Sequence, residues 1–225
     1  SCWVKCKITV IGTKNILLSI KKLFYQAMLG KFFQKPTSEH KDRVPPGQHL
    51  AKGFPVLTYG ATPQVSTEEW EFSVCGLVKP KKWSWSDFME LPHSEFTADF
   101  HCVTRWSKLD VKWTGIKVTD FMKVVEVDAA ATYIIEHCYG GYTTNISIED
   151  FVREENFFAF KLFDEPLSAE HGGPMRTVVP HLYAWKSAKW INSLEFLDHE
   201  ELGFWERNGY HRRGEPFAEE RYSGF

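Results

Sequence analysis

The sequence predicts an α+β fold in which a mixed β-sheet forms the core and short helices lie between the strands. Two observations predict this class. Several short segments alternate between apolar and polar residues, and capped helix starts occur between them. Strands and helices do not alternate strictly, and no glycine-rich loop joins a strand to a helix, so a doubly wound nucleotide-binding fold is disfavoured.

The first strands follow from alternation of apolar and polar side chains. Residues 70–74 alternate Trp, Phe and Val with Glu and Ser, which is typical of a half-buried strand. Residues 95–102 alternate in the same way, with Cys102 ending the apolar face and His101 on the polar face. The charged stretch 104–115 is expected to be a loop.

Short helices are predicted where a small polar residue precedes apolar residues at helical spacing. Ser84 followed by Asp87 forms a capping box, Thr119 is expected to cap a second helix, and Ser147 with Asp150 a third. Further strands are predicted at 132–140, 158–163, 176–179 and 189–196.

Prolines, glycines and charges cluster over residues 34–55 with little periodicity, which is typical of an extended arm. We therefore expect an N-terminal extension and linker over residues 1–53 and one compact domain over residues 54–225.

The overall composition excludes several classes of protein. The formal net charge is -2 with both signs mixed, which disfavours a nucleic-acid partner. Lysines interrupt the apolar N-terminal stretch, so neither a membrane segment of ~20 residues nor an export signal is predicted. The 5 cysteines are odd in number and lack a C-x-x-C pair, which disfavours a disulfide scaffold or zinc site and favours a reducing, cytoplasmic location.

Common catalytic motifs are missing from the sequence. It contains neither a phosphate-binding nor a dinucleotide-binding glycine motif, no H-E-x-x-H and no G-x-S-x-G. Nucleotide-binding, zinc-dependent and serine hydrolase activities are therefore disfavoured.

A reactive thiol is indicated in the segment DFHCVTRWS, residues 99–107. Cys102 lies where a predicted strand opens into a loop, with His101 and Arg105 close in sequence. Positive neighbours favour the thiolate, which is the form that binds a soft metal. The alternative is a buried cysteine that serves only as a small apolar side chain.

An anion site is indicated in residues 170–191. Two glycines precede a proline, so the backbone can turn tightly and approach a ligand closely. Arg176 is suited to binding phosphate, and the turn Ser187, Ala188 and Lys189 offers backbone N–H groups and a further cation. The alternative is a surface hairpin with solvated charges.

A third segment, residues 57–65, precedes the first predicted strand. Tyr59 and Gly60 form an irregular stretch that is expected to lie over a pocket, the alternative being a plain entry loop.

The motif HCVTRWS followed by HGGPMRTVVPHLYAWKSAKWI resembles the molybdopterin-binding oxidoreductase domain of the sulfite oxidase family, from about Phe54 to near Phe225. The similarity is greatest to the small single-domain members. The resemblance implies a cofactor of molybdenum and molybdopterin, with Cys102 as the single protein ligand of the metal. The other residues that it implies at the cofactor are Tyr59, Gly60, Tyr142, Thr143, Thr144, Arg176, Ser187, Ala188 and Lys189.

Two features depart from true sulfite oxidases. The segment 56–59 lacks the arginine of their anion pocket, and neither a dimerisation domain nor a haem domain is present. Sulfite is therefore an uncertain substrate.

The resulting hypothesis is an oxidoreductase that transfers an oxygen atom on a small substrate, either a sulfite-like anion or an S- or N-oxide. His101, Arg105 and His137 are candidates for orienting that substrate. An external electron-transfer partner is expected because no second redox centre is evident. The alternatives are a carrier that binds molybdopterin without catalysis and a structural domain that has lost the cofactor.

Overall fold

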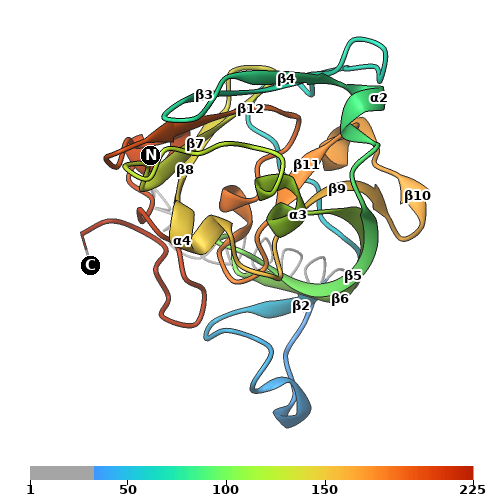
Figure 1. Cartoon of the computed structure of the whole chain (residues 1–225). Helices are drawn as coiled ribbons and strands as arrows, with labels where there is room; N and C mark the ends of the chain where they lie inside the picture. Colours follow the sequence, from blue (N-terminus) through green and yellow to red (C-terminus); the bar gives the residue numbers. More distant parts are fainter. Residues whose placement is uncertain (1–32, 225) are drawn as a thin grey trace, which may run out of the picture.

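The computed structural model describes residues 33–224, so the expected extension over residues 1–32 lies outside the described residues. Two β-sheets form the framework, a larger one of seven strands and a smaller one of five (Figure 1). Short helices lie between and beside them. This arrangement confirms the predicted α+β class.

The larger sheet is organised around one long strand, β6. It pairs antiparallel with β5 on one side and β9 on the other, and its first residues pair parallel with β2. The strands of this sheet are β1 (Phe33–Gln34), β2 (His49–Ala51), β5 (His93–Cys102), β6 (Trp106–Lys117), β9 (Phe157–Leu162), β10 (Glu165–Pro166) and β11 (Arg176–Val178).

The smaller sheet has the order β4-β3-β12-β7-β8. Its central strand, β12, runs parallel to β3 and antiparallel to β7, so the sheet is mixed as predicted. The strands are β3 (Glu71–Gly76), β4 (Lys81–Ser84), β7 (Tyr133–Cys138), β8 (Thr143–Ser147) and β12 (Ile191–Leu197).

The helices are all short, and two of them begin at the predicted caps. The side chains of Ser84 and Ser147 accept hydrogen bonds from the backbone N–H of Asp87 and Asp150. The third predicted cap, Thr119, is wrong, because the helix begins directly after the end of β6. The helices are η1 (Ser38–His40), α2 (Trp85–Phe88), α3 (Val118–Met122), α4 (Ile148–Phe151), η2 (Ala169–His171), η3 (Ala184–Lys186) and α5 (Phe204–Arg207). Within residues 33–224, no helix has the length and apolar character needed to cross a bilayer.

The expected loop at 104–115 is wrong, because most of it belongs to β6. Val111 and Trp113 are fully buried and alternate with Lys112, which is typical of a strand. The pattern is hidden in the sequence because a bulge interrupts β6, where Leu109 and Asp110 lie opposite Asp99 of β5 and Asp110 adopts a positive φ of 55°.

The face of β5 that carries His101 is buried at its end. Phe100 and Cys102 line the pocket and His101 does not, so His101 lies on the opposite face, as predicted. This face was expected to be polar and exposed, but His101 is buried because the C-terminal segment covers it, and its ring contacts Phe217.

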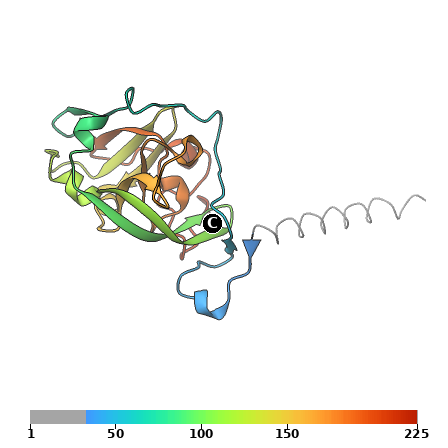
Figure 2. The same cartoon turned by 90° about the vertical axis from the view of Figure 1, so that its right-hand side faces the viewer.

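Residues 33–53 contribute to the larger sheet. β2 is hydrogen-bonded to β6, and Leu50 and Ala51 are buried. The Gln48 side chain donates to the carbonyl of Cys102 at 3.0 Å. Beyond β2, the chain runs along one side of the molecule from the larger sheet to the smaller one (Figure 2). The segment before residue 54 thus supports the end of β5 directly.

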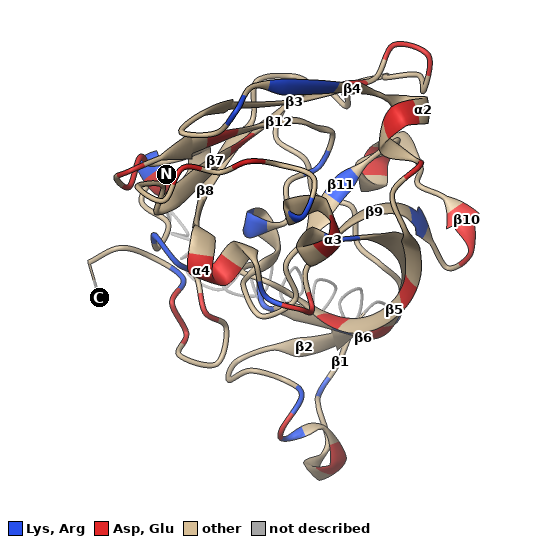
Figure 3. Cartoon of the chain, in the orientation of Figure 1, with Lys and Arg blue, Asp and Glu red and all other residues tan. Residues whose placement is uncertain are grey.

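Aromatic side chains fill the space between the sheets. Phe158 from the larger sheet is fully buried, and its ring lies 5.1–6.2 Å from the rings of Phe72, Phe88, Phe121 and Phe151. Charged residues of both signs are interspersed along the elements around this core (Figure 3).

Removal of this central ring is expected to destabilise the fold strongly. Phe158→Ala should lower the free energy of unfolding by about 3–5 kcal/mol, because it leaves a cavity between the sheets. Phe163→Ala removes an exposed ring and should change it by less than about 0.5 kcal/mol. Urea unfolding of both variants measures the difference, and equal losses would contradict this account of the core.

Candidate functional site

A pocket of about 350 Å³ lies beside the end of β5, under the segment 54–59. Its walls are mostly aromatic, and they come from β5, β6, the β7–β8 turn, η3 and the C-terminal segment. The aromatic lining residues are Phe54, Tyr59, Phe100, Trp106, Tyr142, Trp185, Trp190, Trp205 and Tyr210.

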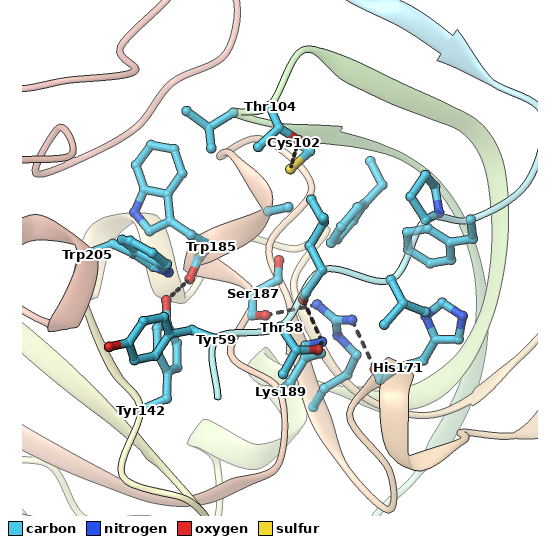
Figure 4. Close-up of a pocket in the computed structure, with 18 of the residues that line it drawn as sticks. Thr58, Tyr59, Cys102, Thr104, Tyr142, His171, Trp185, Ser187, Lys189 and Trp205 are labelled. Atoms are coloured by element: carbon cyan, nitrogen blue, oxygen red, sulfur yellow. Dashed lines mark hydrogen bonds between the residues drawn. The ribbon is translucent and has the colours of Figure 1, made fainter. Parts of the chain in front are cut away.

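Cys102 forms one side of the pocket with Thr104 (Figure 4). The thiol Sγ lies 3.1 Å from the Thr104 hydroxyl oxygen, within hydrogen-bonding distance. Burial raises the pKa of the Cys102 thiol, while Thr104 and the more distant charge of Arg221 partly oppose that rise. The expectation that Arg105 and His101 favour the thiolate is therefore wrong.

Arg176 is buried against the pocket. Its guanidinium donates to the carbonyls of Thr177, His171 and Ser187 at 3.2, 3.0 and 2.9 Å. It also lies over the Phe100 ring, 5.3 Å from its centroid. Burial lowers its pKa to about 10, so the side chain is still a cation at neutral pH.

Lys189 is on the opposite side of the pocket from Cys102 (Figure 4). Its Nζ donates to the carbonyls of Leu57 and Glu170, both at 2.9 Å, and to the Thr58 hydroxyl at 3.1 Å. Burial lowers its pKa to about 7, and the nearby charge of Arg176 acts in the same direction. Lys189 thus ties the segment over the pocket to the pocket wall.

The two glycines before Pro174 allow protein segments to approach each other. A Cβ on Gly172, whose φ is +103°, would lie 2.9 Å from the Lys189 side chain. A Cβ on Gly173 would lie 2.2 Å from the carbonyl oxygen of Leu167. The sequence predicted that the backbone at these glycines would approach another group closely. It does so, and the groups are the Lys189 side chain and the Leu167 carbonyl.

The expected phosphate turn is largely engaged by the protein. The backbone N–H of Ala188 donates to the Thr177 hydroxyl at 2.8 Å, and Ala188 does not line the pocket. Ser187 does line it, and its hydroxyl accepts from the N–H of Val179 at 2.9 Å.

The remaining residues implied by the resemblance divide into two groups. Tyr59 and Tyr142 line the pocket, and the Tyr142 hydroxyl donates to the Trp185 carbonyl at 2.6 Å. Gly60 and Thr143 lie outside the lining.

The three candidates for orienting substrate lie away from the pocket lining. His101 Nδ1 is 2.9 Å from the Ser107 hydroxyl, and burial lowers the His101 pKa to about 4. Arg105 is exposed at the β5–β6 turn with φ 71°. His137 points to the outer face of the smaller sheet, where its Nε2 lies 2.9 Å from Glu195 Oε2.

Sequence reasoning missed several lining residues. Thr104 follows Cys102 by two residues, and His171 directly precedes the two glycines, so proximity to a motif was an available signal. Trp205 and Tyr210 reach the pocket from the C-terminal segment, and the sequence contains no spacing that connects them with Cys102.

The chain is similar to several known oxidoreductases. The family model described as "Oxidoreductase molybdopterin binding domain" matches residues 59–205. The uncharacterized oxidoreductase YuiH of Bacillus subtilis (strain 168) is 43% identical over 188 residues, covering 83% of this chain and 95% of that protein. The catalytic subunit MsrP of protein-methionine-sulfoxide reductase from Ralstonia nicotianae is 28% identical over 153 residues, covering 60% of this chain and 46% of MsrP.

The structure of the sulfane dehydrogenase SoxCD from Paracoccus pantotrophus shares the fold. The TM-score is 0.57 at 18% identity, and the match covers 66% of this chain and 42% of the SoxCD chain. The chain thus spans nearly all of YuiH, but it spans less than half of the length of MsrP and of the SoxCD chain. The match to the family model covers most of the domain predicted from the two motifs. The chain therefore belongs to the family of molybdopterin-binding oxidoreductase enzymes that its two sequence motifs predict.

Proposed function

We propose that this chain binds molybdenum and molybdopterin in the aromatic pocket, with Cys102 as the protein ligand of the metal, and transfers an oxygen atom to or from a small substrate. The observation that carries the proposal is a buried thiol that faces two cationic side chains, Arg176 and Lys189, across one pocket. Family membership supports it.

The donor set fits such a cofactor. A thiolate is a soft ligand suited to a sulfur-rich metal centre. The aromatic walls offer flat surfaces for a pterin ring, and Arg176 and Lys189 offer positive charge for its phosphate. Among residues 33–224, no three His, Cys, Asp or Glu side chains gather into a metal site.

When bound, the cofactor would supply the two-electron redox chemistry and the oxygen-accepting metal. The chain positions the thiol. Gln48 donates to the Cys102 carbonyl, and the Arg221 guanidinium donates to the carbonyl of Val103 at 2.9 Å, so the backbone at the ligand and directly after it is held in place. Thr104 offers a hydrogen bond to the sulfur. The aromatic walls exclude water from the same space.

The surroundings of Cys102 favour a neutral S- or N-oxide over a sulfite-like anion. The lining residues that flank Cys102 in the chain are the apolar Phe100, Val103 and Trp106 and the uncharged Thr104. Of the described residues that line the pocket, Arg176 and Lys189 are the cations, and both already donate to backbone carbonyls. A neutral substrate needs no additional charge to replace its hydration. The name of the relative MsrP, a methionine-sulfoxide reductase subunit, agrees with this substrate class.

The electron donor or acceptor is proposed to be a separate protein, because the described residues 33–224 offer a single cofactor pocket of this kind. The cytoplasmic location stays a prediction.

Loss of the thiol is expected to remove the metal while leaving the fold intact. Cys102→Ala should reduce the molybdenum content of purified protein on the order of 100-fold and abolish redox activity. Cys138→Ala, which removes a buried thiol outside the pocket lining, should retain both. Elemental analysis with fluorescence of the oxidised pterin measures this. Wild-type protein without molybdenum and without pterin would overturn the proposed function.

Cofactor retention is expected to depend on the charge of Lys189. Since this amine is protonated below its pKa of about 7, anion binding should weaken as the pH rises above that value. Pterin release during dialysis should therefore increase between about pH 6 and about pH 9 in the wild type. The Lys189→Met variant should release the pterin roughly ten- to hundredfold faster than the wild type at the lower pH, and its release should not depend on pH in this range. The exposed Lys82→Met variant serves as control, and its release should match the wild type.

The two substrate classes are expected to differ in turnover. With a reduced electron donor, the loaded enzyme should reduce methionine sulfoxide with a kcat/KM at least about tenfold above that for sulfite oxidation, a difference of about 1.4 kcal/mol in transition-state binding. Steady-state assays with both substrates decide this, and a preference for sulfite would contradict the assignment to a neutral substrate.

A further inference from the structure

A carboxyl group without a hydrogen-bond partner is buried beneath the pocket. Glu136 lies in the middle of β7 with its side chain toward the interior, and it is 0% exposed. Neither of its carboxyl oxygens has a hydrogen-bond partner among residues 33–224. An ionised carboxylate in such a position would be costly, so its proton occupancy is sensitive to nearby charge.

Charged groups face Glu136 from three neighbouring elements. Arg176 comes from β11, Lys186 from η3 and Glu206 from α5. Lys186 and Glu206 form a buried ion pair, with 2.7 Å between Nζ and Oε1. Arg176 and Lys186 carry two positive charges, and an ionised Glu206 carries one negative charge. The cluster therefore has a net charge of +1 unless Glu136 is also ionised.

Neutral groups complete the surroundings of Glu136. The Thr177 hydroxyl on β11 helps to hold its pKa down, although it makes no hydrogen bond of good geometry to either oxygen. Cys138 and Tyr142 are close enough to sense the charge of Glu136, and burial raises the pKa of both well above their ordinary values, so both are neutral at physiological pH. Glu200 acts on Lys186 from farther away.

The balance of these effects leaves Glu136 able to change its protonation near neutral pH. Burial raises the pKa of this carboxyl to about 8, and the charges of Lys186 and Arg176 prevent a larger rise. Arg176 and Tyr142 both line the pocket and both interact with Glu136. A change of charge in the pocket therefore shifts the pKa of Glu136, because the protein interior screens charges poorly.

We propose that Glu136 is a proton-binding site whose occupancy follows the charge held in the pocket. It takes up a proton when the pocket becomes more negative and releases one when the pocket becomes less negative. The inference rests on the proposed function, in which reduction of bound molybdenum supplies the negative charge. The electron comes from an external one-electron donor, the proton comes from solvent, and an O–H bond forms on the Glu136 carboxylate.

A second cavity offers a route for that proton. It has a volume of about 530 Å³ and is lined by Lys186 and Asn145 among other polar residues. Lys186 Nζ donates to the side-chain and backbone oxygens of Asn145 at 2.7 and 2.8 Å, and it also contacts Glu206. Lys186 thus lines this cavity and also acts electrostatically on Glu136.

The first test is a redox titration of the molybdenum-loaded protein over a range of pH. Around and above about pH 8, the midpoint potential of the wild type should fall as the pH rises, because reduction becomes coupled to proton uptake. Glu136→Gln should show a shallower slope, since only other groups then take up protons. Glu165→Gln, which removes an exposed carboxylate on β10, should match the wild type.

A second measurement needs no variant. Above about pH 8, where Glu136 is ionised before reduction, the reduced-minus-oxidised infrared difference spectrum of the wild type should show a band of a protonated carboxylic acid that gains intensity on reduction and shifts in heavy water. Absence of this band would overturn the inference, even where Glu136→Gln fails to load cofactor.

A third measurement is independent of the cofactor. In the chain purified before loading, Glu136 keeps its proton up to about pH 8, whereas the unfolded chain loses it near 4.5. The contribution of Glu136 to the free energy of unfolding is therefore fully present below about pH 4.5 and is lost as the pH rises to about 8. The Tm of the wild type should fall relative to that of Glu136→Gln across this window, and Glu165→Gln should track the wild type.

The outcomes separate the two proposals. Loaded protein with the same potential slope in the wild type and Glu136→Gln would overturn the role of Glu136 and leave the proposed function standing. A chain that holds no molybdenum would overturn the proposed function and the redox linkage with it. A Tm difference that does not change with pH would show that Glu136 does not hold a proton in the folded chain.

Discussion

The three hydrogen bonds of the Arg176 guanidinium to backbone carbonyls hold the pocket together. They connect the carbonyls of His171, Thr177 and Ser187, so three segments around the pocket share one buried cation. The guanidinium is planar and carries several donors in fixed directions, which a lysine cannot reproduce. Its charge is also placed against the Phe100 ring, two residues before Cys102. The Gly-Gly-Pro-x-Arg segment and the strand that carries the thiol are thus connected through one side chain.

Burial is the common cause of the unusual titration behaviour around this pocket. It lowers the pKa of His101 to about 4 and of Lys189 to about 7, and it raises the pKa of Glu136 to about 8. The directions differ because burial disfavours the charged form, which is the protonated form of histidine and lysine but the deprotonated form of glutamate. A site with several such groups responds strongly to an added charge, which suits an enzyme whose cofactor changes oxidation state.

Elements that depend on neighbouring residues were predicted correctly from the sequence. Elements that depend on contacts with distant segments were not. Ser84 and Ser147 cap helices as predicted, because a cap depends on residues within one turn. The long strand β6 was expected to be a loop, because a bulge and the left-handed Asp110 interrupt its alternation. Burial of His101 likewise follows from contact with Phe217, which is distant in sequence.

The sequence by itself determined the family, because the cysteine motif and the Gly-Gly-Pro-x-Arg motif are short, contiguous strings. It also indicated that Arg176 and Lys189 act near Cys102. The tertiary structure alone decided that His137 points away and that Trp205 and Tyr210 complete the walls. It also placed the fully buried Glu136 close enough to Arg176 and Lys186 to interact with their charges. These features depend on register and on long-range packing, and neighbouring residues in the sequence do not encode them.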